Sequence, residues 1–221
     1  MSLRTDNTAS GCFITLEGSE GVGKSTNLAF IRQWLEEQGR DPVITREPGG
    51  TPMAEEIREL LLSQRDEKVS EKAELLLMFA ARAQHLDEKI LPELARGGCV
   101  VSDRFTDATY AYQGYARGLN LDWIMQLEQL VQEKVRPDLT ILLDLPTEIA
   151  RQRMNKRGTT DRFEQEQTQF FDRVRQGYLT RAKAEPERFA VIDAGQSLDK
   201  VQQDITEVLL RFFSNTAEHQ I

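Results

Sequence analysis

Short apolar runs alternate along the chain with longer stretches in which apolar residues recur every three or four positions. The apolar runs predict buried strands within residues 12–18, 41–50, 97–105, 138–146 and 188–195. The periodic stretches predict helices at residues 24–38, 53–62, 70–96, 122–134, 147–155, 167–184 and 198–213, with Pro92 interrupting the third. Because strands and helices alternate, we expect an α/β fold with a parallel sheet that is covered by helices on both faces.

The pattern indicates one domain. The 221 residues, of which 39% are hydrophobic, suffice for a single core, and no repeat or linker divides residues 11–213. The two ends, residues 1–10 and 214–221, are expected to be flexible.

Composition limits the classes of binding partner and the cellular compartment that fit this chain. A net charge of −8 argues against sequence-independent binding of nucleic acid, which needs clustered Lys and Arg. The longest apolar run is too short to span a membrane and the N-terminus lacks an apolar signal core, so we expect a cytoplasmic protein without a membrane partner. Cys12 and Cys99 lie in apolar, strand-like runs, and we expect buried thiols rather than a disulfide.

The stretch "GSEGVGKS" fits the spacing of a phosphate-binding loop, and it stands between a predicted strand and a predicted helix. Glycines allow backbone N–H groups to turn toward phosphates, and the helix that follows offers its positive N-terminus. Lys24 is expected to reach the outer phosphates of a nucleotide, and the Ser25 hydroxyl is expected to ligate Mg²⁺. The residues expected to bind this nucleotide are Gly18, Ser19, Glu20, Gly21, Val22, Gly23, Lys24, Ser25 and Thr26.

A second candidate site follows the strand "GGCVVSDRF". Asp103 and Arg104 stand at its carboxyl end, where open α/β sheets bind ligands. We expect Asp103 to hold Mg²⁺ through water, and the alternative is an aspartate that caps a loop. Asp144, at the end of "LLLD", is expected either to hold Mg²⁺ in the same way or to be a structural hydrogen-bonding residue.

A basic segment at about residues 151–163 surrounds a glycine. Its cations are Arg151, Arg153, Lys156, Arg157 and Arg162. We expect a catalytic lid, because mobile arginines lower the barrier of phosphoryl transfer, although such charge runs are often only solvated loops. The two histidines, His85 and His219, lack the partner spacing of a metal site or a triad, and no catalytic role is assigned to them.

Other uses of a phosphate-binding loop fit less well. A GTPase needs Asn-Lys-x-Asp after a strand, and "NKRG" at residues 155–158 has Gly in place of Asp. No second cluster indicates a motor or partition ATPase. A small-molecule kinase is therefore favoured, and a non-catalytic nucleotide-binding regulator stays open as the alternative.

Over nearly the whole chain the sequence resembles the thymidylate kinase family. The pieces that carry the resemblance are "LEGSEGVGKST", "TREPGGTPMAEEIRELLL", "LLLMFAARAQHL", "SDRFTDATYAYQG", "ARG", "RPDLTILLDLP" and "RGTTDRFEQE". The chain looks most like the bacterial form, in which the catalytic arginine comes from the lid, because Gly21 rather than Arg follows Glu20.

The resemblance implies a P-loop kinase fold with a short lid, transfer of the γ-phosphoryl of ATP to dTMP, Mg²⁺ as cofactor, and a homodimer. It implies Lys24, Arg104, Arg153 and Arg157 as catalytic residues. For dTMP it implies that Arg46 and Arg104 hold the phosphate, Glu20 faces the 3′-hydroxyl, Tyr112 lies near the sugar, and Arg82 and Thr109 read thymine. Gln113 lies in the same loop as Thr109, Pro48 follows a cis peptide bond, and either Met78 or Phe79 stacks on the base. Ala108 stands where the family usually has Ser. A different nucleoside monophosphate kinase is the alternative enzyme.

Overall fold

The structure is a computed structural model that describes residues 11–155 and 168–218. Its centre is a five-stranded sheet in which all strand pairs are parallel, in the order β2-β3-β1-β4-β5. The strands are β1 (Cys12–Glu17), β2 (Val43–Arg46), β3 (Cys99–Asp103), β4 (Leu139–Asp144) and β5 (Phe189–Asp193). The expected parallel sheet is confirmed. Strand β1 lies at its centre, between β3 and β4, so the loop after β1 lies at the point where the strand order reverses, which is where such sheets bind ligands.

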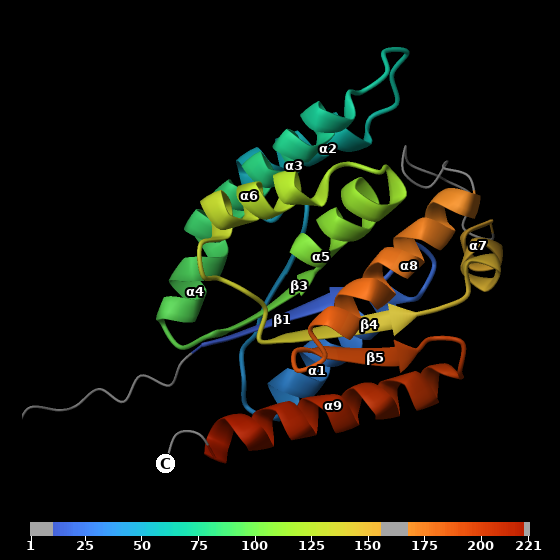
Figure 1. Cartoon of the computed structure of the whole chain (residues 1–221). Coiled ribbons are helices and arrows are strands. Elements are labelled where there is room, and N and C mark those ends of the chain that lie inside the picture. Colours follow the sequence, from blue (N-terminus) through green and yellow to red (C-terminus); the bar gives the residue numbers. More distant parts are fainter. Residues whose placement is uncertain (1–10, 156–167, 219–221) are drawn as a thin grey trace, which may run out of the picture.

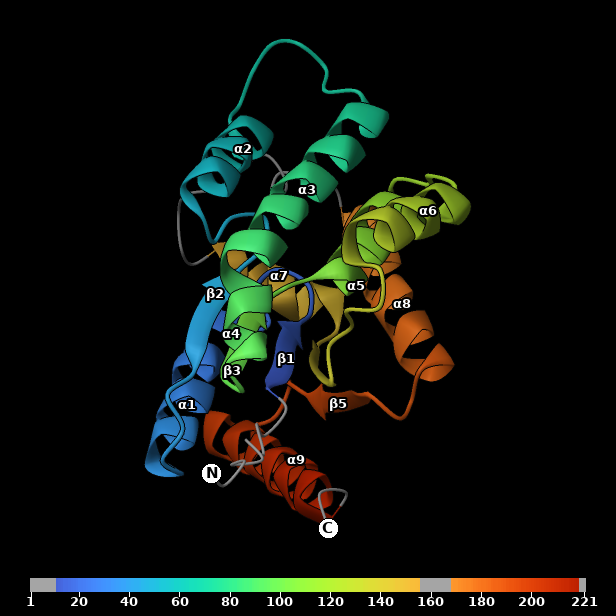
Figure 2. The same ribbon diagram turned by 90° about the vertical axis from the view of Figure 1, so that its left-hand side faces the viewer.

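Helices cover both faces of the sheet (Figure 1). They are α1 (Lys24–Glu37), α2 (Pro52–Leu62), α3 (Glu71–His85), α4 (Leu91–Ala95), α5 (Thr106–Thr109), α6 (Leu121–Gln132), α7 (Thr147–Asn155), α8 (Thr168–Ala184) and α9 (Leu198–Glu218). Two π-helical turns, η1 (Leu86–Ile90) and η2 (Tyr110–Ala116), extend α3 and α5. Helices α1 and α9 lie on one face, and α5 and α8 lie on the other, with α2, α3 and α6 beyond them (Figures 1 and 2).

Each face of the sheet has its own apolar core. Ile14, Leu16 and Ile141 point toward α1 and α9, where they pack with Ile31 and Ile205. On the other face, side chains of η2 and α8 pack with β4. Cys12 and Cys99 lie opposite each other in the β1–β3 pair and are buried free thiols, as expected. None of the described helices is long and apolar enough to cross a membrane.

Local chemistry explains where some helices begin. The Thr51 hydroxyl accepts a hydrogen bond from the Ala54 N–H, and Pro52 occupies the first turn of α2. The Asn120 side chain caps α6 by accepting from the Asp122 N–H. The peptide bond between Glu47 and Pro48 is cis, as expected.

The structure differs from the sequence pattern in three segments. The long helix predicted over residues 70–96 is divided into α3, η1 and α4, with Pro92 in the first turn of α4. Residues 106–116 form α5 and η2, although Thr109 and Gln113 were expected in a loop. Helix α9 continues to Glu218, beyond Phe213, where the pattern ended it, so residues 214–218 are helical.

Candidate active site

The loop between β1 and α1 has the form expected for phosphate binding. Gly18, Gly21 and Gly23 have φ angles of 137°, 75° and 96°, in the region that favours glycine. A Cβ atom on Gly21 would lie 2.4 Å from the carbonyl oxygen of Ala150, so α7 packs directly on the loop. Only glycine fits there without moving a backbone.

Lys24, the first residue of α1, extends back over this loop. Its Nζ donates hydrogen bonds to the carbonyl oxygens of Gly18 at 3.2 Å and Ser19 at 2.9 Å. Burial, together with the charge of Arg104, lowers the pKa of Lys24. Ser25 and Thr26 are exposed on the first turn of α1, so their hydroxyl groups are accessible to a ligand.

Asp103 ends β3 beside the loop, since it lies opposite Leu16 of β1. Its Oδ1 atom is buried and has no hydrogen-bond partner among the described residues. A buried carboxylate oxygen without a partner fits an acceptor for water on Mg²⁺. In the described part of the chain, no three His, Cys, Asp or Glu side chains cluster as a metal site.

A pocket of about 570 Å³, which includes space open to solvent, lies next to the loop. Every residue expected to bind dTMP lines it, except Arg46 and Phe79. Residues that sequence reasoning did not assign to the site also line it: Glu47, Arg58, Leu62, Phe105 and Ala108. Glu20 belongs to both the loop and the pocket, so the two sites are continuous.

Arg46 and Phe79 lie outside the pocket lining. The side chain of Arg46 is 53% exposed, and its Nη2 donates to Glu55 Oε2 at 2.8 Å. Phe79 is 2% exposed and packs in the core with Leu75 and Tyr110. Since neighbouring helix positions point in different directions, Met78 lines the pocket and Phe79 does not. The sequence left the two open, and the spacing of four residues between Met78 and Arg82, which puts them on one helix face, is a signal that could have separated them.

Arg104 is held at the end of the pocket nearest the loop. Its Nη2 donates to Glu20 Oε1 at 2.6 Å, and its guanidinium lies 4.8 Å from the ring centre of Tyr112. The Tyr112 hydroxyl donates to the same Glu20 oxygen at 3.2 Å. Burial alone would raise the pKa of Glu20, but the charges of Arg104 and Lys24 hold that pKa below its ordinary value. Glu20 therefore stays ionised at neutral pH.

A second polar group in the pocket centres on Arg82, which is 2% exposed. Its Nε donates to Glu47 Oε2 at 2.7 Å, and its Nη2 donates to the Thr109 hydroxyl at 2.9 Å. Nη1 has no partner among the described residues. Gln113 is fixed in the same wall because its amide donates to Glu74 Oε1 at 2.8 Å. The arrangement leaves one buried N–H group of a pocket-lining arginine without a partner among the described residues.

Comparison with known proteins gives a consistent result. The family model described as thymidylate kinase matches residues 16–205. The chain belongs to the thymidylate kinase family. It is 60% identical over 199 residues to a thymidylate kinase of Hahella chejuensis, covering 90% of this chain and 96% of the relative. It is 59% identical over 199 residues to one of Ectopseudomonas mendocina, covering 90% and 95%. A crystal structure of thymidylate kinase from Ehrlichia chaffeensis matches with a TM-score of 0.73 at 33% identity, covering 90% of this chain and 99% of that one. This member of the family is a phosphotransferase with the P-loop kinase fold.

In this thymidylate kinase family member, sequence reasoning missed two residues behind Arg104. Tyr178 of α8 accepts from Arg104 Nη1 at 3.1 Å and donates to Glu17 Oε2 at 2.8 Å. Glu17 Oε1 accepts from the Phe105 N–H at 2.7 Å. Burial, with the charge of nearby Asp107, raises the pKa of Glu17 to about 8. These residues are far apart in the chain, so no local pattern indicated them.

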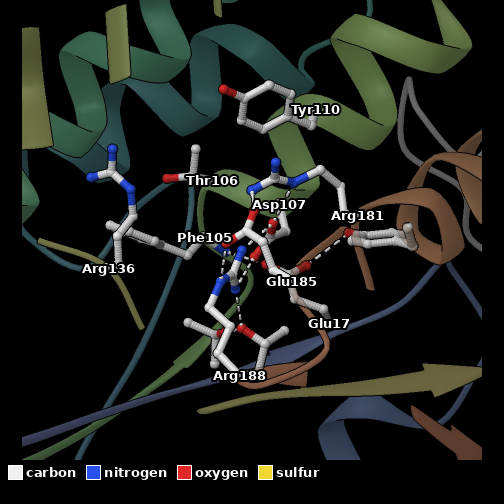
Figure 3. Close-up of polar contacts among 12 residues, drawn as sticks. Glu17, Phe105, Thr106, Asp107, Tyr110, Arg136, Arg181, Glu185 and Arg188 are labelled. Atoms are coloured by element: carbon white, nitrogen blue, oxygen red, sulfur yellow. Dashed lines mark hydrogen bonds and ion pairs between the residues drawn. The ribbon is translucent and has the colours of Figure 1, made fainter. Parts of the chain in front are cut away.

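The segment that carries Thr109 is fixed by buried charges (Figure 3). Asp107 of α5 accepts from Arg181 Nε at 3.0 Å and from Arg188 Nη1 at 2.8 Å. Tyr110 donates to Glu128 Oε2 at 2.6 Å, which ties the start of η2 to α6. The pocket wall formed by this segment is therefore anchored to α6, α8 and the start of β5.

The structure describes only part of the expected lid. Arg153 of α7 donates from Nη1 to the carbonyl oxygen of Ala194 at 3.2 Å. Arg157 and the rest of residues 156–163 lie outside the described residues. Asp144 accepts from Nε and Nη2 of Arg175 at 2.7 and 2.8 Å, which supports the structural interpretation of that aspartate.

Proposed function

We propose that the pocket binds dTMP beside a loop that binds ATP, and that this chain transfers the γ-phosphoryl group of ATP to dTMP, giving dTDP for dTTP synthesis. The observation that carries this proposal is the position of Glu20, which lines the pocket while its Oε2 lies 3.9 Å from Lys24 Nζ. The acceptor phosphate and the donor phosphates would therefore meet beside Glu20. Such alignment of two anions supplies most of the catalysis in phosphoryl transfer.

The charged end of the pocket suits a phosphate monoester. Its second pKa is about 6, so it is already an anionic nucleophile at neutral pH and needs no general base. Lys24 and Arg104 would neutralise charge that moves during transfer. Arg58 would supply a further cation, since it lines the pocket and is oriented by a 2.8 Å bond from Nη1 to the carbonyl oxygen of Pro48. Ionised Glu20 would accept a hydrogen bond from the 3′-hydroxyl.

The other end suits thymine. The free Nη1 donor of Arg82 would bind the O4 acceptor, and the Thr109 hydroxyl would accept from N3–H. Met78 and Phe105 would surround the methyl group. Cytosine presents an amine where thymine has O4, so two donors would face each other, at a cost of about 1 to 3 kcal/mol. Uracil lacks only the methyl group, which is worth about 1 to 3 kcal/mol in an apolar pocket.

We also propose that Mg²⁺ is held by Ser25 and, through water, by Asp103. When bound, the ion would neutralise charge on the ATP phosphates. The buried Oδ1 of Asp103 supports this assignment.

A cytoplasmic homodimer is proposed as well. Two large apolar side chains seven positions apart on one face of α6 support a surface that a second copy covers: Trp123 and Leu130 are 39% and 75% exposed. Light scattering that gives a monomer mass at assay concentration would refute the dimer and leave the catalytic proposal standing.

Coupled detection of ADP with a panel of monophosphates tests the assignment. The expected order of kcat/KM is dTMP, then dUMP, then dCMP, with purine monophosphates last because of their size. Arg82→Ala is expected to lower kcat/KM for dTMP and to reduce its preference over dCMP. Equal turnover of dCMP or a purine monophosphate would refute the specificity. ATP binding without turnover of any acceptor would indicate a regulator.

A further inference from the structure

His85, which no mechanism above uses, is joined to the pocket through one residue. It is fully buried at the end of α3, one helical turn after Arg82. Its Nδ1 lies 2.9 Å from Glu47 Oε1, and its Nε2 lies 2.7 Å from the Thr45 hydroxyl. The other oxygen of Glu47 accepts from Arg82 Nε at 2.7 Å. Four buried side chains thus form one connected row that ends at the pocket.

The donors in this row can be assigned. An ionised carboxylate only accepts, so Nδ1 of His85 carries the hydrogen that binds Glu47. In the neutral ring Nε2 then accepts, and the Thr45 hydroxyl donates to it. Glu47 consequently receives a hydrogen bond on each oxygen, one from His85 and one from Arg82. Thr45 belongs to β2, so the row is tied to the sheet.

Close packing holds the imidazole in this orientation. A Cβ atom on Gly50, whose φ is +92°, would lie 2.4 Å from Nε2 of His85 and 2.6 Å from Oγ1 of Thr45. The turn formed by residues 47–50 therefore closes directly on the ring. The ring has little room to rotate, and Glu47, at the start of the same turn, has a fixed partner.

We propose that His85 is a positioning residue for base recognition. It fixes Glu47, and through Glu47 the guanidinium of Arg82, whose buried Nη1 has no partner among the described residues. The inference rests on the proposed function, in which Arg82 reads thymine. Because Nε and Nη2 of Arg82 are both held by hydrogen bonds, Nη1 points in one direction only. Its N–H groups can pair with an acceptor on the base, but not with a donor.

Two matched variants separate the two ring nitrogens. In His85→Asn the amide nitrogen replaces Nδ1, so the bond to Glu47 is kept and the contact with Thr45 is lost. In His85→Gln the amide nitrogen replaces Nε2, so the bond to Glu47 is lost. Both remove part of a buried ring, which makes their effects on packing comparable. The measurements are kcat and KM for dTMP, dCMP and ATP, with the Tm of each variant.

His85→Gln is expected to lower kcat/KM for dTMP about tenfold, which is the size expected for loss of a hydrogen bond to a charged group. The change should appear mainly in the KM for dTMP, with the KM for ATP unchanged, and the preference for dTMP over dCMP should shrink. His85→Asn should keep most of the kcat/KM for dTMP and most of the preference for dTMP over dCMP. Equal losses in both variants, or an equal rise in the KM for ATP, would refute the positioning role and indicate packing alone.

A double-mutant cycle tests whether His85 acts through Arg82. In the Arg82→Ala background, His85→Gln should change kcat/KM for dTMP less than about twofold. The same loss as in the wild-type background would refute the inference while the base-reading role of Arg82 stands. Wild-type kinetics in Arg82→Ala would instead refute that role, and the inference with it.

A threonine pair supplies the control. Thr45→Val removes the hydroxyl that binds His85, whereas Thr15→Val removes a buried strand hydroxyl that binds Thr140 at 2.9 Å. Both should lower Tm, and both, like His85→Asn, should keep most of the preference for dTMP over dCMP, because neither removes the bond between His85 and Glu47. A loss of preference in either variant as large as that in His85→Gln would refute the proposal.

Discussion

Replacing Glu17 with Gln should change how stability depends on pH. Glu17 ends β1 with no exposed surface, and its carboxyl contacts the Phe105 N–H and the Tyr178 hydroxyl. Within the described residues no cation forms an ion pair with it, and Asp107 lies near it (Figure 3). Burial and that neighbouring charge raise the pKa of Glu17 from an ordinary value of 4.5 to about 8.

The sign and size of the effect follow from linkage. Between the two pKa values the folded protein keeps a proton on Glu17 that the unfolded chain has lost. The unfolding free energy therefore falls as pH rises through this window, by up to about 1.4 kcal/mol for each pH unit. Over the whole window the loss is on the order of 5 kcal/mol. The amide that Glu17→Gln introduces does not titrate, so the unfolding free energy of the variant does not fall with pH for this reason.

Urea unfolding of both proteins at pH 5, 6, 7 and 8 measures the effect. The wild-type free energy of unfolding should fall relative to that of Glu17→Gln at each step, because the other titrating groups contribute equally to both curves. Equal m-values would show that the unfolded states are comparable. A difference in unfolding free energy between the two proteins that stays constant from pH 5 to pH 8 would refute the prediction that Glu17 is protonated in the folded state.

Three further predictions concern catalysis and the loop. Lys24→Ala should nearly abolish kcat with Tm largely kept, since its hydrogen bonds in the described structure go to the carbonyl oxygens of its own loop, and wild-type turnover would exclude Lys24 from the mechanism. Arg153→Ala and Arg157→Ala should each lower kcat more than they raise either KM, and a rise confined to the KM for ATP would make them binding residues. Gly21→Ala should lower the free energy of unfolding in urea more than Gly39→Ala does. Both glycines have positive φ, where an alanine costs about 1 to 2 kcal/mol, but only a Cβ at Gly21 would meet a backbone oxygen. Equal losses in the two variants would contradict the contact with α7.

The features that the sequence predicted are those encoded in contiguous residues. The phosphate-binding loop needs a strand, a fixed spacing of glycines and a helix, and all of these lie within residues 12–38. Buried parallel strands are similarly visible as apolar runs. Most pocket residues were reached by resemblance to a family, and their positions around one cavity support that route.

Other features depend on contacts between distant segments. Glu17 and Tyr178 are 161 positions apart, and neither stands in a pattern that suggests a partner. His85 lacked a partner spacing because its partners, Thr45 and Glu47, are 40 and 38 positions away. The segment at residues 106–116 holds two Thr, three Tyr and one Gly, which are weaker helix formers than its three Ala, so its local preference is mixed and packing against α8 and α6 supports the helical form.

The cations of the pocket and of the loop beside it differ in the groups that hold them, and we expect this difference to separate specificity from turnover. Arg82 is neutralised by Glu47, so it adds little net positive field and contributes mainly a directed donor. Lys24 is bound chiefly by neutral carbonyl oxygens and lies 3.9 Å from Glu20, so more of its charge is available to phosphates. Loss of a directed donor changes which base is accepted, whereas loss of an available charge changes how fast the phosphoryl group moves. An acidic chain can therefore act on two anionic substrates, because the positive charge that it needs is local to the loop and the pocket.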